Sequence, residues 1–306
     1  MCGIVGLFIK NPKLEPKLGR LLAGMLEEMT SRGPDSAGFA LYGNQPYGNQ
    51  AYGSKAETAL KATLRAPSPE RAQAVADELA ARLQATATIR DTHTVLSLTE
   101  EQVPALHDAL AAQYSDLELV GLGHRMEIYK EVGLPAQISA RFALESMAGT
   151  HAIGHTRMAT ESAVTTDGAH PFSTGRDQCL VHNGSLSNHN RLRDVLRRQG
   201  LTIDTMNDTE VGAAYLSWRM REGMSLGEAL ESSLKDLDGF YTFVVGTENG
   251  FGVLRDPIAC KPAVMAETDD YVAFGSEYRA LADLPDIANA RLFEPEPATV
   301  YFWERQ

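Results

Sequence analysis

The 306-residue sequence has few cysteines, few basic residues and no long hydrophobic run. Its three cysteines, Cys2, Cys179 and Cys260, form no CxxC pair, which argues against a disulfide framework and against a zinc or iron–sulfur site in this chain. With 28 lysines and arginines against 40 aspartates and glutamates, the net charge is −12, so neither a nucleic acid nor a membrane surface is expected as partner. No apolar stretch approaches the ~20 residues that span a bilayer, and no signal peptide is recognisable. We expect a soluble, cytoplasmic protein.

The order of predicted strands and helices indicates an α+β fold with stacked sheets. Strands are predicted at residues 152–157, 178–182 and 240–247, and amphipathic helices at 187–199 and 209–222. Because the strands cluster and do not alternate strictly with the helices, stacked sheets are expected.

Residues 54–145 differ from the rest of the chain. They contain an alanine-rich helical pattern at Pro69–Leu83, a strand at Thr94–Leu98, a capping box that begins at Thr99, and a further predicted strand at 125–131. The histidines in this region have no ligand spacing. We interpret residues 54–145 as a small α/β insertion in the main fold, without catalytic residues of its own.

Cys2 is the first candidate for chemistry. Methionine is normally removed before a small second residue, and the product would carry a thiol and a free α-amine on Cys2. An α-amine has a pKa of about 7.7–8.0, so near neutral pH it can accept the proton of the thiol. This is the N-terminal nucleophile arrangement, in which one residue supplies nucleophile and base. The alternative is a buried cysteine at the start of a strand.

Asn183 and Gly184 follow a predicted strand within Val-His-Asn-Gly-Ser. A side-chain amide followed by an unobstructed backbone N–H offers two donors that can converge on the oxyanion of a tetrahedral intermediate. The alternative is a type I′ turn, for which Asn-Gly is a favoured pair.

Arg157 and Asp208 are candidates for substrate binding. Arg157 ends a predicted strand, where a guanidinium can hold a carboxylate through two parallel hydrogen bonds. Asp208 lies at the start of a predicted helix, where its carboxylate could bind a substrate ammonium group. Taken singly, each has a structural alternative: Arg157 a surface ion pair, and Asn207 or Asp208 the helix N-cap.

Six motifs in a fixed order resemble those of the class II glutamine amidotransferases, which are N-terminal nucleophile hydrolases. The resemblance covers nearly the whole chain outside 54–145. It implies a four-layer αββα sandwich, so that residues 1–306 form one amidotransferase domain interrupted by the insertion. The motifs are Cys-Gly-Ile-Val-Gly from Cys2, Arg-Gly-Pro-Asp-Ser-Ala-Gly from Arg32, Gly-His-Thr-Arg-Met-Ala-Thr from Gly154, Ala-His-Pro-Phe from Ala169, Val-His-Asn-Gly from Val181 and Asn-Asp-Thr-Glu from Asn207.

The resemblance implies roles for the catalytic residues. Cys2 attacks the side-chain amide of glutamine, with its own α-amine as the base, and Asn183 with the Gly184 N–H forms the oxyanion hole. Arg32 lies in a turn near the nucleophile, where a positive charge favours a thiolate. The products are glutamate and ammonia, formed through a γ-glutamyl thioester.

The resemblance also implies a binding site for the head group of glutamine. Arg157 holds the α-carboxylate and Asp208 the α-ammonium, with Thr160 nearby. Two other interpretations remain open: an N-terminal nucleophile amidase acting on a different amide, and a non-catalytic scaffold that keeps the fold.

The ammonia acceptor is not recognisable in the sequence. The 306 residues contain no phosphoribosyl-pyrophosphate loop, no ATP-pyrophosphatase motif and no sugar isomerase half. Together with the insertion, this favours a subunit of a glutamate-synthase-like hetero-oligomer, such as N-methylglutamate synthase. FMN and iron–sulfur clusters would then belong to partner subunits, and this chain would bind no metal or cofactor.

Overall fold

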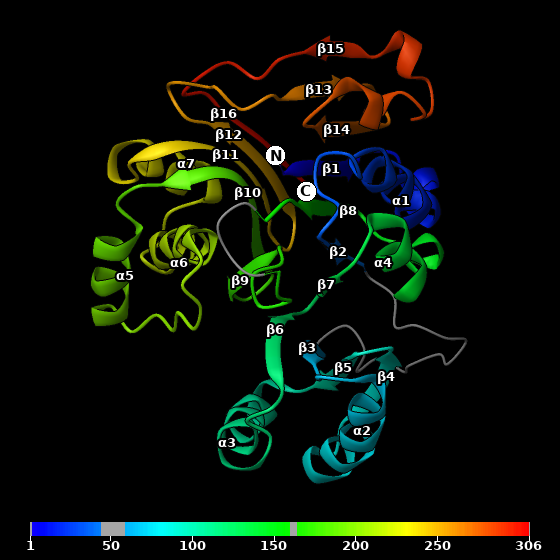
Figure 1. Ribbon diagram of the computed structural model, residues 1–306, viewed down its shortest axis with the longest axis vertical. Helices are drawn as coiled ribbons and strands as arrows, with labels where there is room; N and C mark the ends of the chain where they lie inside the picture. The colour runs from blue at the N-terminus through cyan, green and yellow to red at the C-terminus, as the bar shows by residue number, and fades with distance from the viewer. Residues whose placement is uncertain (1, 44–58, 160–163, 306) are drawn as a thin grey trace.

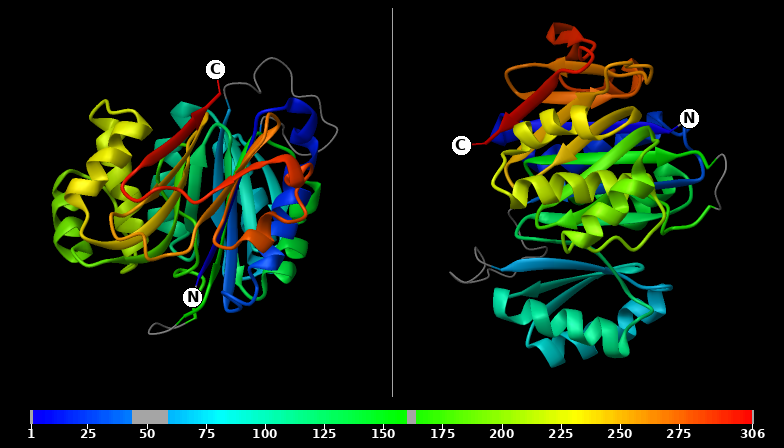
Figure 2. Two further views of the ribbon diagram at one scale, coloured as in Figure 1. Left: turned by 90° about the horizontal axis from the view of Figure 1, so that it is seen from above. Right: turned by 90° about the vertical axis from the view of Figure 1, so that its left-hand side faces the viewer.

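The computed structural model describes residues 2–43, 59–159 and 164–305. Two antiparallel sheets stack face to face, with helices on both outer surfaces (Figures 1 and 2). The seven-stranded sheet has, in order, β15 (Arg291–Phe293), β13 (Val264–Glu267), β14 (Tyr271–Gly275), β1 (Gly3–Ile9), β8 (His151–Arg157), β2 (Ser36–Tyr42) and β7 (Met126–Val132). The five-stranded sheet has β16 (Val300–Glu304), β12 (Gly250–Arg255), β11 (Gly239–Gly246), β10 (Gln178–Leu186) and β9 (Phe172–Gly175).

Strand β1 shows why both faces of the seven-stranded sheet are covered. Every residue of β1 is buried, because successive side chains point to opposite faces of the sheet and both faces are covered. Ile4 and Phe8 pack between the two sheets with residues such as Phe251. Leu7 and Ile9 join the cluster on the other face, which includes residues of α1.

Helices form the two outer layers. On the seven-stranded sheet lie α1 (Leu18–Glu28) and α4 (Pro135–Arg141). On the five-stranded sheet lie α5 (His189–Arg198), α6 (Asp208–Arg221) and α7 (Leu226–Asp236). This is the four-layer αββα sandwich that the resemblance implied, and the predicted fold class is confirmed. Short 3₁₀ helices occur at Pro12–Lys17, Glu100–Gln102, Leu144–Ser146, Tyr278–Leu281 and Ile287–Asn289.

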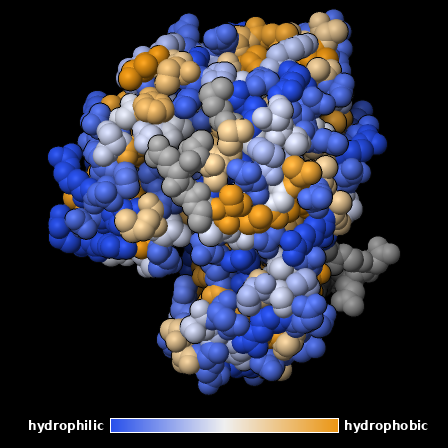
Figure 3. Space-filling view, in the orientation of Figure 1, coloured by the Kyte–Doolittle hydropathy of each residue, from blue (hydrophilic) through white to orange (hydrophobic). Residues whose placement is uncertain are grey.

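Residues 60–123, called the insertion below, form a separate lobe beneath the sandwich in Figure 1. Its four-stranded sheet has the order β4 (Thr86–Arg90), β5 (His93–Leu98), β3 (Leu60–Arg65) and β6 (Glu118–Gly123), with α2 (Pro69–Leu83) and α3 (Val103–Gln113) packed against it. Its surface is mostly hydrophilic on the face that Figure 3 shows.

The range 54–145 predicted for the insertion is wider than this lobe. The strand predicted at 125–131 is β7, which pairs with β2 in the seven-stranded sheet, and α4 packs against α1. Residues 54–58 lie outside the described residues. A strand pattern does not reveal which sheet the strand joins, because that depends on a partner far away in the sequence. Within the described ranges, every helix is too short or too polar to cross a membrane.

Candidate active site

Cys2 lies just before β1, at the edge of the sandwich where several predicted residues meet. Cys2 is partly exposed, whereas Cys179 is buried and Cys260 lies on the surface. The Cys2 carbonyl oxygen accepts hydrogen bonds from Arg32 Nε at 2.9 Å and from Asn183 Nδ2 at 3.2 Å. Cys2, Arg32 and Asn183, far apart in sequence, therefore form one cluster.

The Arg32 side chain is fixed from two directions. It is only 7% exposed, and its Nη1 donates to Glu277 Oε1 at 2.7 Å. This hydrogen bond, aided by the charge of Arg279, lowers the pKa of Glu277, so the carboxylate stays ionised. Glu277 was not among the residues predicted for the site. Nothing in the sequence connects it to the site, because it lies 245 positions from Arg32.

Asn183 and Gly184 lie inside strand β10. They pair with Thr242 and Tyr241 of β11, so the alternative of a type I′ turn is wrong. Gly184 has a φ of 146°, a conformation that favours glycine, and a Cβ atom there would lie 2.0 Å from the Phe240 carbonyl oxygen. Only glycine fits at position 184, directly after Asn183, whose side chain contacts Cys2.

Arg157 reaches the same edge through the register of the sheet. Thr156 pairs with Gly3, so Arg157 at the end of β8 lies beside the start of β1. Its guanidinium packs against Gly168, where a Cβ atom would lie 2.9 Å from Nη1. Thr160 lies outside the described residues.

Asp208 is the first residue of α6, and Asn207 is the N-cap, since its Oδ1 accepts a hydrogen bond from the Thr209 N–H at 2.8 Å. The Asp208 carboxylate is left for other contacts. Its Oδ2 accepts the Leu186 N–H at 2.9 Å, and its Oδ1 lies 3.8 Å from His182 Nδ1. Through Leu186, Asp208 is attached to the strand that carries Asn183.

Three buried histidines, one from each of three motifs, lie behind these residues. Burial lowers the pKa of His155 to about 3 and also lowers the pKa values of His170 and His182, so all three are neutral. His155 Nε2 donates to the His182 carbonyl oxygen at 3.2 Å. Thr209 Oγ1 lies 3.0 Å from His182 Nδ1 and 3.1 Å from His170 Nε2. A hydroxyl carries one hydrogen, so Thr209 donates to one histidine and accepts from the other. These histidines stand within the sequence motifs, but no role was predicted for them.

The geometry defines a class of protein: two stacked antiparallel sheets between helical layers, with a cysteine before a central strand and polar groups from both sheets around it. No cluster of His, Cys, Asp or Glu in the described part of the chain is arranged to hold a metal ion.

Comparisons with known proteins agree with this class. Residues 155–283 match the family model described as a glutamine amidotransferase domain. The chain is 59% identical over 308 residues to the glutamine amidotransferase-like protein GlxB of Rhizobium meliloti (strain 1021), covering 100% of this chain and 99% of that protein. It is 36% identical over 307 residues to a protein of Methanothermobacter thermautotrophicus whose name also contains glutamine amidotransferase, covering 98% and 99% of the two chains.

Among solved structures, glutamine phosphoribosylpyrophosphate amidotransferase from B. subtilis has a TM-score of 0.61 at 19% identity, which shows a shared fold. The match covers 99% of this chain and 47% of that one, so this chain spans about half the length of the B. subtilis enzyme. This chain belongs to the class II glutamine amidotransferase family and is an enzyme of that class.

Proposed function

We propose that this chain is a glutaminase subunit that releases ammonia from glutamine through a Cys2 thioester and supplies it to a partner synthase. The observation that carries the proposal is that Arg32 and Asn183 both donate hydrogen bonds to the Cys2 carbonyl oxygen, while Cys2 itself is partly exposed.

The proposed reaction uses Cys2 as nucleophile and base. Once Met1 is removed, the neutral α-amine accepts the thiol proton, and the sulfur attacks the amide carbon of glutamine. The Asn183 amide has two hydrogens, and one is used by the Cys2 carbonyl. The second hydrogen and the Gly184 N–H would bind the oxyanion. The amine then gives its proton to the leaving ammonia, and water hydrolyses the thioester to glutamate.

The head group of glutamine would lie between Arg157 and Asp208. The guanidinium would bind the α-carboxylate with two hydrogen bonds. Asp208 would accept from the α-ammonium through its carboxylate, whose Oδ2 also accepts the Leu186 N–H. This pair of opposite charges suits an α-amino acid better than a simple amide. Thr160 is proposed to lie near this group, as in the family.

For the acceptor, we propose a partner of the glutamate-synthase or N-methylglutamate-synthase type. The support is the insertion, which adds a separate lobe to the sandwich. FMN and iron–sulfur clusters would belong to that partner. Native purification with a flavoprotein is the expected result, and a self-sufficient homo-oligomer would contradict this part of the proposal.

The test of the glutaminase proposal is the intact mass of the protein before and after incubation with a diazo-ketone analogue of glutamine. We expect loss of Met1 and a single adduct on Cys2. The Cys260→Ser variant controls for the exposed cysteine and should still be labelled, whereas Cys2→Ala should not. A trimmed chain that neither reacts nor hydrolyses glutamine would favour a different amide. A chain that retains Met1 would favour a scaffold, because its amine would be in a peptide bond.

A further inference from the structure

Partly buried ion pairs join the insertion to the sandwich. Lys61 of β3 binds Glu127 of β7, with 2.7 Å between Nζ and Oε1. Lys130 of β7 binds Glu118 of β6 at 3.1 Å, and the Lys130 side chain is only 3% exposed. In the first pair the lysine belongs to the insertion, and in the second it belongs to the sandwich.

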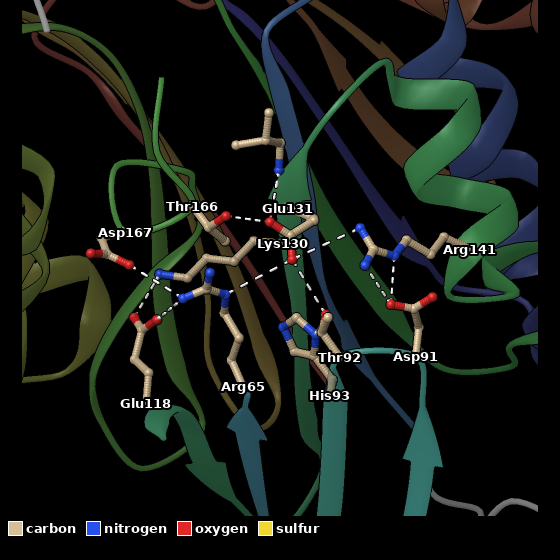
Figure 4. Close-up of polar contacts among 11 residues, drawn as sticks. Arg65, Asp91, Thr92, His93, Glu118, Lys130, Glu131, Arg141, Thr166 and Asp167 are labelled. Carbon is tan, nitrogen blue, oxygen red and sulfur yellow. Dashed lines mark hydrogen bonds and ion pairs between the residues drawn. The ribbon is translucent and has the colours of Figure 1, made fainter. Parts of the chain in front are cut away.

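Arg65, at the end of β3, makes a different set of contacts (Figure 4). Its Nη1 lies 3.4 Å from Glu118 of the insertion and 3.3 Å from Asp167 of the sandwich, and its Nε lies 3.9 Å from Glu131 at the end of β7. A cleft of about 810 Å³ borders Arg65 and Asp167, and the Asp167 side chain is 70% exposed. Arg65 thus joins the insertion to residues 164–168.

Glu131 is the buried member of this network. Its carboxylate accepts hydrogen bonds from Thr166 Oγ1 and, at 3.3 Å, from Thr92 Oγ1 of the insertion, and it lies 3.9 Å from Arg141. Thr92 has one hydroxyl hydrogen and gives it to Glu131, so His93 Nδ1 must donate to Thr92 at 3.1 Å. A buried carboxylate is stable only while its partners remain in place, so these residues keep one arrangement.

Residues 164–168 connect the network to Arg157. The Gly168 N–H donates to the Thr165 carbonyl at 3.2 Å and the Ala169 N–H to the Thr166 carbonyl at 2.9 Å, so Thr166, Asp167 and Gly168 form one compact turn. Gly168 packs against the Arg157 guanidinium. A shift of Thr166 or Asp167 would therefore move the surface that supports this guanidinium.

We propose that Arg65 and Glu131 are positioning residues that hold the 164–168 turn behind Arg157, so that the insertion sets the affinity of the enzyme for glutamine. Arg65 does this through Asp167, and Glu131 through Thr166. The inference rests on the proposed role of Arg157 in binding the α-carboxylate. The coupling between Arg65 and the turn can nevertheless be measured without any activity.

The first test replaces Arg65 with methionine in the full chain. We expect faster hydrogen exchange in peptides covering residues 164–169, and a KM for glutamine that rises about two- to thirtyfold, the range for coupling through a packed network, with kcat nearly unchanged. Arg71→Met is the matched control, because Arg71 pairs with Asp116 inside the insertion, with Nε 2.7 Å from Oδ2. It should alter neither quantity.

The second test separates the hydroxyl of Thr166 from its shape. Thr166→Val removes the donor to Glu131 and should reproduce the rise in exchange and in KM. Thr166→Ser keeps the hydroxyl and should restore values near those of the unmodified enzyme. A role in overall stability alone would change the melting temperature of these variants without separating KM from kcat.

Three results discriminate the possibilities. Unchanged exchange at 164–169 in a folded Arg65→Met variant would overturn the coupling. Faster exchange with an unchanged KM would overturn the link to glutamine affinity. If the unmodified enzyme neither hydrolyses glutamine nor reacts with the diazo-ketone, the proposed function fails, and the exchange data alone decide whether Arg65 positions the turn.

Discussion

Acidification should destabilise this protein well before its carboxylates are protonated, because histidines are buried in neutral form. Burial lowers the pKa values of His151 and His155 to about 3, and those of His93 and His170 well below the ordinary value. In the unfolded chain these side chains would titrate near pH 6.5. The unfolded state therefore binds more protons, and the free energy of unfolding falls as the pH drops below about 6.5.

The size of this loss of stability follows from the difference between the pKa of each histidine in the folded and in the unfolded chain. Between pH 7.5 and 5.5, each histidine that stays neutral in the fold lowers the free energy of unfolding by about 1.4 kcal/mol. The four together should lower it by about 5 kcal/mol, a large part of the 5–15 kcal/mol typical of a domain.

Urea unfolding at several pH values measures this effect. His151 is held in the fold, because its Nε2 donates to the Thr247 carbonyl at 2.8 Å and its ring stacks on Tyr42. His151→Gln removes this neutral histidine and should therefore reduce the pH dependence of the free energy of unfolding by about one proton. A free energy of unfolding that differs by less than about 1 kcal/mol between pH 7.5 and 5.5 would refute the reasoning.

Three further predictions concern the site. Gly184→Ala should cost about 2–6 kcal/mol through backbone strain and overlap with Phe240, and should abolish most glutaminase activity. Gly200→Ala, also at positive φ but with open space around it, should lose only the strain energy; equal melting temperatures and activities for the two variants would contradict this. Arg157→Lys should raise KM for glutamine more than its retained charge suggests, because the two-hydrogen-bond fork is lost. Unchanged turnover would instead favour another amide as substrate. Glu277→Gln should destabilise the fold at neutral pH, and the difference from the unmodified enzyme should shrink as the pH falls through the lowered pKa of Glu277, because the interaction with Arg32 stabilises only the ionised form. Urea unfolding of both proteins checks this, and a difference that does not shrink at all between neutral and acidic pH would exclude the ion pair with Arg32 as its cause.

Much of the candidate site could be predicted from the sequence motifs. Chemistry restricts the side chains that can serve as nucleophile, oxyanion donor or carboxylate ligand, and Cys2, Asn183 and Arg157 are such residues. Local pattern also predicted the α2 helix at Pro69–Leu83 with its observed bounds, since its apolar spacing and its Ser68 cap are properties of neighbouring residues.

Other features depended on residues far apart in the chain. A single residue could be interpreted in two ways, as with the turn considered for Asn183-Gly184 or the cap at Asn207, until its strand or helix was placed. The extent of the insertion was overestimated because β7 finds its partner β2 more than eighty positions earlier.

The sequence by itself determined the family and the class of fold, because these are carried by residue types in a fixed order; it also led us to propose Cys2 as the nucleophile. Only the tertiary structure decided that Glu277 fixes Arg32, that His170 and His182 share the Thr209 hydroxyl, and that Arg65 reaches the turn behind Arg157. Those contacts arise from sheet pairing and burial, whose energies depend on which distant residues are brought together and leave no trace in local spacing.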